Sequence, residues 1–273
     1  MHAFSYQQPT SILDACSILR SDPESKLIAG GQTLLPSMRL RLIRPTQLVD
    51  LSGINELRGI TDSAGALTVG AMTRHCEVAS SPAVRARIPA LAELASLIGD
   101  RMVRNMGTLG GSVANSDPAA DYPAALVALN AVITTNARSI PAEDFFKGLF
   151  ETALAPDELV VRVTFPIPKR AAYIKFRHPA SRFALVGVCV ADTDLGPRVA
   201  VTGAGASVFR LPQLESALRD NFAPHAVAAL TVPADMLNTD LHATSEYRAH
   251  LTKVLARRAV ERAVSDSAPH YGK

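Results

Sequence analysis

The sequence predicts an α+β protein with a two-lobed N-terminal part and a smaller C-terminal α+β domain. Three observations support this fold class. Strand, helix and strand patterns alternate over residues 26–51, as in a small parallel unit. From residue 58 the pattern changes to a hairpin followed by helices, which indicates a second lobe. The final third alternates strand patterns before a long amphipathic helix, which predicts a separate domain.

The composition is that of a globular protein. The chain has 273 residues, 48% of them hydrophobic, which is enough for one large domain or two ordinary ones. Lys and Arg number 28 against 25 Asp and Glu, so the charge balance does not indicate a nucleic-acid surface. Tryptophan is absent and aromatic residues are few, which argues against a base-stacking surface.

The cysteine content indicates a reducing compartment. Cys16, Cys76 and Cys189 show no Cys-x-x-Cys spacing, so we expect a cytoplasmic protein with no metal cluster of its own. The N-terminus lacks a signal-peptide pattern, and no apolar run is long enough to span a bilayer. We therefore expect no direct membrane insertion, and any membrane association would need a partner.

The first lobe begins with a helix capped by Thr10 or Ser11. Strands are expected at 26–29 and 47–51, with a second helix between them. The apolar faces of the two helices are predicted to consist of Ile12, Leu13, Cys16 and Leu19 in the first and Leu34, Leu35, Met38 and Leu42 in the second.

Two short glycine segments, AGGQT at 29–33 and TLGGS at 108–112, resemble each other although they are far apart in the sequence. Glycine lets the backbone adopt positive φ and approach a ligand closely, and successive N–H groups can form a concavity for phosphate oxygens. The hydroxyls of Thr33, Thr108 and Ser112 could add donors. A single Gly-Gly pair is usually a tight turn, but two similar segments facing one another would suit a diphosphate.

Neither segment is a known nucleotide-binding motif. No Gly-Lys-Ser/Thr follows them, and neither has the third glycine of the dinucleotide fingerprint; Gly203-Ala204-Gly205 also lacks it and is predicted to be a turn. A diphosphate held by backbone without lysine favours a bound dinucleotide, and FAD is the natural candidate.

The second lobe contains a candidate polar ligand, Asp121. Helices are expected at 73–79 and 89–98, and His75 and Cys76 in the first of these are predicted to be packing or surface residues. Ser116 or Asp117 is expected to cap a helix opened by Pro118. Asp121 would then either favour the helix dipole or accept hydrogen bonds from a flavin or ribityl hydroxyl, and both interpretations remain open.

The remaining strands and the domain limits follow from apolar patterns and prolines. Strands are expected at 132–135, 157–165, 172–176, 184–191 and 198–202, and a helix at 245–264. Pro166-Ile167-Pro168 forms a natural boundary. We therefore expect a domain at 1–168, with lobes of about 1–57 and 58–168, and a second domain at 169–273.

Three segments resemble a known family. These are AGGQTLLPSMRLRL, IGDRMVRNMGTLGGSVANSDPAADYPAAL and SEYRAHLTKVLARRAVERAV. They closely resemble the FAD-binding medium subunit of molybdenum hydroxylases, which includes the medium subunit of carbon monoxide dehydrogenase and the FAD-binding subunit of xanthine dehydrogenase. The resemblance covers essentially the whole chain. It implies a two-lobed FAD-binding domain of the vanillyl-alcohol-oxidase (PCMH) type, followed by the family's C-terminal flavoprotein domain.

The resemblance also implies the residues that bind non-covalent FAD. Asp121 would bind ribityl or nearby hydroxyls, Val160 an adenine-side contact, and Lys175 the isoalloxazine, where an ammonium would stabilise the anionic reduced flavin. Lys175 could instead be an ordinary surface lysine. The loop 177–183 departs from the family pattern, because Arg182 replaces an acidic residue. The residues expected around the diphosphate are Leu27, Ile28, Ala29, Gly30, Gly31, Gln32, Thr33 and Leu34 on one side and Thr108, Leu109, Gly110, Gly111 and Ser112 on the other.

The implied function is electron transfer within a complex. A large subunit would carry the molybdenum cofactor, a small subunit would carry iron–sulfur clusters, and this chain would pass electrons to quinone, NAD or oxygen. No residue of this chain is expected to be catalytic or to bind a metal. The alternatives are a stand-alone non-covalent flavin oxidoreductase and a flavin-free assembly scaffold.

Overall fold

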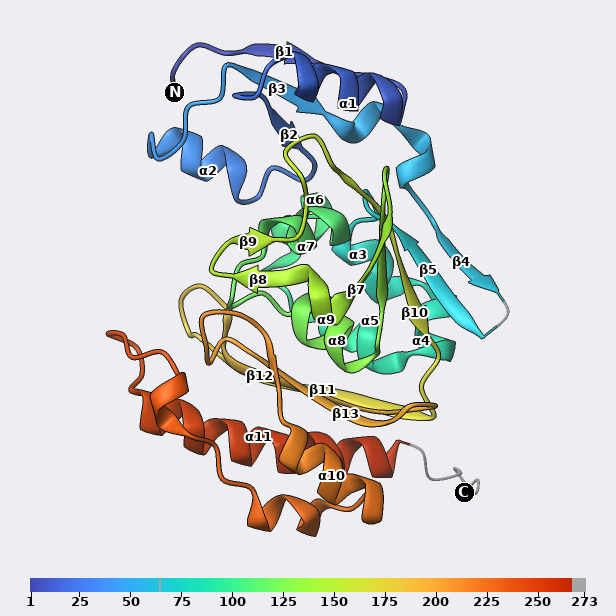
Figure 1. The fold of residues 1–273 in the computed structure, drawn as a ribbon, viewed down its shortest axis with the longest axis vertical. Coiled ribbons are helices and arrows are strands. Elements are labelled where there is room, and N and C mark those ends of the chain that lie inside the picture. Colours follow the sequence, from blue (N-terminus) through green and yellow to red (C-terminus); the bar gives the residue numbers. More distant parts are fainter. Residues whose placement is uncertain (64, 267–273) are drawn as a thin grey trace.

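The computed structural model describes residues 1–63 and 65–266 and confirms the α+β class. Figure 1 shows a small sheet at the N-terminal end of the molecule, a larger sheet with helices in the middle, and a third sheet covered by α10 and α11 at the opposite end. Within the described residues, the strand order is β1-β3-β2 in the first sheet, β4-β5-β10-β6-β7 in the second and β11-β12-β13-β14 in the third, and β8 and β9 form a separate two-stranded ribbon. No described helix is both long and apolar enough to cross a membrane.

The first sheet is parallel, as the alternation of strand and helix predicts. Ser11 caps α1 by accepting the amide hydrogen of Asp14, which confirms the predicted start. Leu13, predicted on the apolar face, is 80% exposed, and Leu42 is 72% exposed, because α2 ends before it. The sequence analysis missed β1, whose three residues are all exposed and show no alternation. The elements are β1 (Ser5–Gln7), α1 (Ile12–Ser21), β2 (Lys26–Ile28), α2 (Leu34–Arg39) and β3 (Gln47–Asp50), followed by short 3-10 helices at Leu51–Gly53 and Asn55–Leu57.

The middle sheet is antiparallel and packs against short helices (Figure 1). Its predicted hairpin and central strands are confirmed, but α4 and α6, each six residues long, were not predicted. The elements are β4 (Ile60–Ser63), β5 (Ala66–Gly70), α3 (His75–Ser80), α4 (Pro82–Arg87), α5 (Pro89–Ser96), α6 (Arg101–Met106), α7 (Leu109–Asn115), α8 (Tyr122–Ala128), β6 (Val132–Thr135), β7 (Ser139–Pro141), α9 (Ala142–Phe145), β8 (Phe146–Gly148), β9 (Glu151–Thr152) and β10 (Val160–Pro166).

Pro118 does not open a helix, contrary to the prediction. Ser116 instead ends α7 in the left-handed conformation with φ 47°, and α8 begins only at Tyr122. The Asp117 carboxylate accepts the amide hydrogen of Ala119 at 2.8 Å, which stabilises a turn before Asp121.

The third sheet is antiparallel, and the long helix α11 lies along it (Figure 1). Leu251, Leu255 and Ala259 of this helix are buried, as its apolar pattern predicts, whereas Tyr247 is 43% exposed. The elements are β11 (Arg170–Arg177), β12 (Ala184–Thr193), β13 (Gly196–Thr202), β14 (Phe209–Arg210), α10 (Pro212–Asp220), 3-10 helices at Pro224–Ala229 and Ala234–Met236, and α11 (Ser245–Ser265).

One hydrophobic core runs from the middle sheet into the third sheet. It contains Leu109 and Tyr122 of the middle region together with Tyr173 and Cys189 of β11 and β12. The opposite face of the third sheet forms a separate core with α10 and α11. The third sheet is therefore buried on both sides, and one of its faces helps to fix the region around Asp121.

Candidate functional site

The two glycine segments lie against one another. A Cβ atom added at Gly30 would lie 2.3 Å from the carbonyl oxygen of Met106 and 2.6 Å from Cα of Gly107. A Cβ atom at Gly111 would lie 3.4 Å from Cβ of Ala29. The absence of a side chain at Gly30 thus allows the turn after β2 to touch the connection between α6 and α7.

The first segment presents unused backbone donors. Among the described residues, no acceptor receives the amide hydrogens of residues 30–33. Gly31 has φ 69°, a conformation that favours glycine. Gly30 and Gly31 are half-buried, while Gln32 and Thr33 are exposed. Unbonded N–H groups at an accessible turn are the donors that phosphate oxygens need.

The second segment is a helix start rather than a loop, which corrects the predicted conformation. Thr108 caps α7, and its hydroxyl accepts the amide hydrogen of Gly111 at 3.2 Å. The amides of Leu109 and Gly110 donate to the carbonyl oxygens of Thr73 at 3.0 Å and Ala71 at 2.8 Å. These donors are therefore satisfied inside the protein.

Close packing, and not positive φ, accounts for Gly110. A Cβ atom at this position would lie 2.4 Å from Cβ of Ala71, which no structure tolerates without displacement. Gly111 and Ser112 are half-buried, whereas Thr108, Leu109 and Gly110 are buried. Only the second half of this segment is therefore open to a ligand.

Asp121 lies in a buried cluster with two residues of β11. The Asp121 side chain is 4% exposed and that of Lys175 is 1% exposed, and their charged atoms are 2.9 Å apart. The Tyr173 hydroxyl donates to Oδ1 of Asp121. Burial raises the pKa of Asp121 and lowers that of Lys175, while the charge of each partner acts against these shifts. Lys175 is thus neither free nor on the surface.

The third sheet holds the turn that leads to Asp121. The Thr202 hydroxyl donates to the carbonyl oxygens of Pro118 at 2.8 Å and Ala120 at 2.6 Å. The Gly203 amide donates to the same oxygen of Pro118 at 2.7 Å. These bonds join β13 to the middle region, so the third sheet fixes Asp121 through the backbone as well as through β11.

The loop after β11 also reaches this cluster. The carbonyl oxygen of Arg182 accepts a hydrogen bond from Nζ of Lys175 at 3.1 Å, and Arg182 has φ 62°. His178 accepts the amide hydrogens of Ala180 and Ser181 through Nδ1 and contacts His242 through Nε2 at 3.2 Å. Arg182, which is expected to depart from the family pattern, therefore binds Lys175 through its backbone in this chain.

The remaining predicted residues lie in two places. Leu27 and Ile28 form part of β2 and are half-buried, as is Leu34 at the start of α2. Val160 pairs with Thr135 in the middle sheet and is 5% exposed, so its side chain faces the core. A ligand contact at Val160 would thus have to involve its backbone or its neighbours.

Sequence reasoning missed Tyr173, and it predicted His75 as a packing or surface residue, of which the structure shows the packing one. Tyr173 stands two residues before Lys175, and strand alternation places both side chains on one face, so this spacing could have indicated the pair. His75 is 4% exposed, and its Nδ1 atom has no partner among the described residues. Burial, and to a smaller extent the charge of Arg104, lowers its pKa from 6.5 to about 4. A Cβ atom at Gly107 would lie 2.6 Å from Nε2 of His75, so the ring packs against the residue that directly precedes the second glycine segment.

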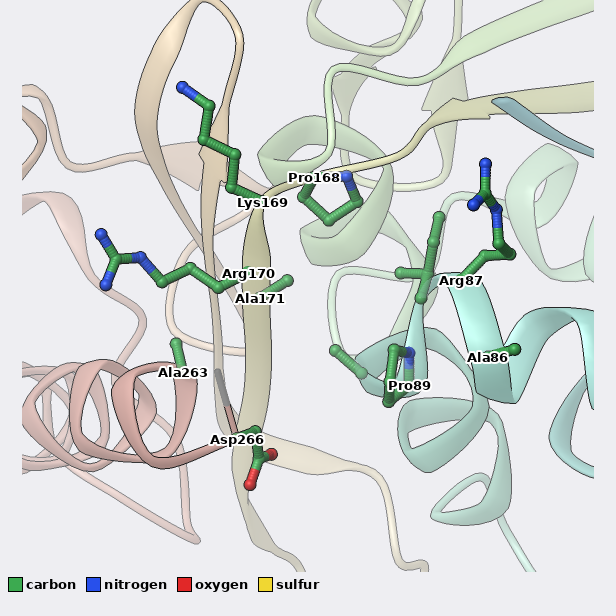
Figure 2. Close-up of a pocket in the computed structure, with 11 residues that line it drawn as sticks. Ala86, Arg87, Pro89, Pro168, Lys169, Arg170, Ala171, Ala263 and Asp266 are labelled. Carbon is green, nitrogen blue, oxygen red and sulfur yellow. The ribbon is translucent and has the colours of Figure 1, made fainter. Parts of the chain in front are cut away.

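The donor set of the first segment fits a diphosphate, and the half-buried Gly111 of the second segment lies beside it. Figure 2 shows a pocket elsewhere, of about 180 Å³, between the end of α4 and the start of β11. Its cations, Arg87, Lys169 and Arg170, point apart in that view. Arg87 and Arg170 are paired with Asp62 and Asp192. This pocket is not part of the glycine site.

Comparison with known proteins gives a consistent result. Residues 2–168 match the family model described as "FAD binding domain in molybdopterin dehydrogenase". The chain is 36% identical to the nicotine 6-hydroxylase medium subunit of Paenarthrobacter nicotinovorans, over 94% of this chain and 96% of the relative. It is 33% identical to the carbon monoxide dehydrogenase medium chain of Hydrogenophaga pseudoflava, over 95% of this chain and 96% of the relative.

Solved structures agree with these relatives. A carbon monoxide dehydrogenase from Hydrogenophaga pseudoflava superposes with a TM-score of 0.89 at 32% identity, covering 97% of this chain and 98% of that chain. Quinoline 2-oxidoreductase from Pseudomonas putida 86 superposes with a TM-score of 0.88 at 31% identity, with the same coverage.

Proposed function

We propose a function from the family to which this chain belongs, the FAD-binding domains of molybdopterin dehydrogenases. The chain is the medium, FAD-binding subunit of a molybdenum hydroxylase complex, and it transfers electrons through a non-covalently bound flavin. The observation that supports the flavin site most directly is the row of unused amide donors at residues 30–33. When bound, the flavin supplies the redox chemistry.

We propose that the flavin's diphosphate is held mainly by the backbone of the first segment. Residues 27–34 would line it, and residues 108–112 would close it from the other side through Gly111 and Ser112. Asp121 would accept a hydrogen bond from a ribityl or nearby hydroxyl. Lys175, through its charge, would favour a reduced, anionic flavin. Val160 would lie near the adenine. The chain's own residues thus bind and orient the cofactor and set its electrostatic environment.

The partners follow from the family as well. A large subunit would carry the molybdenum cofactor and oxidise the substrate, and a small subunit would deliver electrons through iron–sulfur clusters. The electron acceptor would be quinone, NAD or oxygen, and the complex would act in the cytoplasm or on a membrane that it reaches through partners.

We further propose that the chain divides into domains at 1–168, with lobes of about 1–57 and 58–168, and at 169–273. The end of the family match at residue 168 supports this division. Residues 267–273 of the second domain lie outside the described residues.

The first experiment is the visible absorption spectrum of the purified full chain, with analysis of any flavin released by heat. Near-equimolar free FAD is expected. Gly111→Asp should abolish FAD binding, because the added carboxylate would lie beside Ala29 and repel the diphosphate.

Gly111→Asn is the matched control for this charge effect. It has nearly the same shape without the charge, so it should retain part of the FAD affinity. A colourless wild-type chain that takes up no added FAD would contradict flavin binding by the isolated chain. Equal losses in both variants would mean that shape, and not charge, excludes the cofactor.

A further inference from the structure

We infer that Tyr173 is a positioning residue of the flavin site, which fixes the carboxylate of Asp121 as an ionised hydrogen-bond acceptor. The inference rests on the proposed role of Asp121 in binding a flavin hydroxyl. It goes further in assigning a function to a residue of the third sheet that would act only through Asp121.

Both carboxylate oxygens of Asp121 have a donor on β11. The Tyr173 hydroxyl donates to Oδ1, and Nζ of Lys175 donates to Oδ2 at 2.9 Å. Two donors from one strand fix both the rotation and the position of the carboxylate. Each oxygen still has a lone pair left, so Asp121 can accept a further hydrogen bond from a ligand hydroxyl.

The two donors differ in what they can do. Nζ of Lys175 also donates to the carbonyl oxygen of Arg182, so movement of the 178–183 loop would affect it. Tyr173 is 1% exposed and its only polar partner among the described residues is Asp121. Burial and the adjacent carboxylate raise the pKa of Tyr173 well above its usual value, so this hydroxyl remains a donor at every relevant pH.

Gly187 of β12 makes room for the hydroxyl. A Cβ atom at Gly187 would lie 2.3 Å from the Tyr173 oxygen and 2.9 Å from Cγ2 of Thr202. A side chain on the neighbouring strand would therefore displace the hydroxyl from Asp121. The register, which pairs Gly187 with Lys175, puts this glycine opposite the cluster.

The Tyr173 hydroxyl influences the protonation of Asp121. Burial has the largest effect on this carboxylate and favours its neutral form, whereas Lys175, Tyr173 and Arg177 of β11 favour the anion. From α8 the facing titratable group is Tyr122, which stays neutral because burial raises its pKa strongly. With the Tyr173 donor removed, the pKa of Asp121 should rise, and a protonated carboxyl would lose its role as a purely accepting group.

The test measures the dissociation constant of FAD for the full chain from pH 5 to pH 9 by fluorescence quenching. For Tyr173→Phe we expect the affinity for FAD to be about tenfold weaker at neutral pH. The acid limb of the profile, which is the fall in affinity as the pH is lowered, should begin about one pH unit higher than in the wild type. Gly187→Ala, which keeps the hydroxyl but displaces it, should shift the profile in the same direction. Asp121→Asn cannot be protonated and should show no acid limb.

Tyr122→Phe is the matched control, because its buried hydroxyl has no partner among the described residues. This variant should leave the acid limb in place.

If the wild type binds no FAD at all, the proposed function fails. If the wild type binds FAD but Tyr173→Phe, with an unchanged melting temperature, keeps the wild-type pH profile, only the inference about Tyr173 is wrong. If Tyr173→Phe does not fold, the profile of Gly187→Ala decides in the same way.

Discussion

The two glycine segments resemble each other in sequence and differ in what their glycines do. In residues 29–33 the glycines bend the chain, with φ 69° at Gly31, and leave amide donors unbonded. In residues 108–112 the chain is helical, and the amides of Leu109, Gly110 and Gly111 are already bonded within the protein. One segment therefore offers donors to a ligand, and the other supports the first.

The difference shows that a Gly-Gly pair is not by itself evidence of a phosphate site. Gly110 is required because α7 approaches Ala71, and Gly30 because the first turn approaches Met106 and Gly107. Close packing and ligand access thus select the same residue type for different reasons. Only the hydrogen-bond partners of the backbone distinguish the two cases.

The largest expected effect is on the free energy of unfolding and comes from a substitution in the second segment. Gly110→Ala should destabilise the FAD-free chain by about 2–3 kcal/mol, because the new methyl group overlaps Ala71. Urea unfolding followed by circular dichroism measures this. The adjacent Gly111→Ala is the control and should stay within ~1 kcal/mol of wild type, since its nearest obstacle is a side-chain hydroxyl and alanine favours the helix. Equal costs would contradict the packing explanation for Gly110.

A pH-dependent effect should arise from His75 of α3, which packs beside the second segment. The pKa of His75 is lowered from 6.5 to about 4 in the folded chain, so the unfolded chain binds the proton first as the pH falls. The stability that comes from the neutral His75 is therefore present above about pH 6.5 and is lost progressively as the pH falls towards 4, by about 3 kcal/mol in all. Unfolding free energies across this range measure it.

The non-titrating His75→Phe variant should lose this share of the pH dependence. The exposed His250 provides the control, and His250→Gln should keep the wild-type slope. A slope unchanged in His75→Phe would mean that His75 does not contribute to the pH dependence of stability.

The smallest expected effect is on hydrogen exchange, and it tests the difference between the two glycine segments most directly. Without FAD, the amides of residues 30–33 should exchange hydrogen rapidly, whereas those of residues 109–111 should already be protected. Saturating FAD should slow exchange at residues 30–33 by about tenfold or more, ~1.4 kcal/mol. Hydrogen-exchange mass spectrometry with peptides covering each segment measures both. Equal gains of protection in the two segments would show that both supply ligand donors.

Most of the fold could be predicted from periodicity and capping residues. The start of α1 at its Ser11 cap, the β4–β5 hairpin and the long helix α11 follow from local signals. Among the elements that were missed, β1, α4 and α6 are three to six residues long, and segments this short carry too few apolar positions to show a period. Leu13 was wrongly placed on the apolar face because a single exposed leucine does not interrupt such a pattern.

The sequence by itself determined the fold class, the family and the stretches that we propose for the flavin site, because these depend on residue types and local spacing. The tertiary structure alone decided which backbone donors remain free. That depends on acceptors such as the carbonyl oxygens of Ala71 and Thr73, which are distant from Gly110 in the sequence. It also decided that Pro118 lies in a turn, because Thr202 and Gly203 bond the carbonyl oxygen that a helix would have used. Long-range hydrogen bonds and close contacts leave no periodic trace in the sequence, which is why the burial of Lys175 beside Asp121 and Tyr173 appears only in three dimensions.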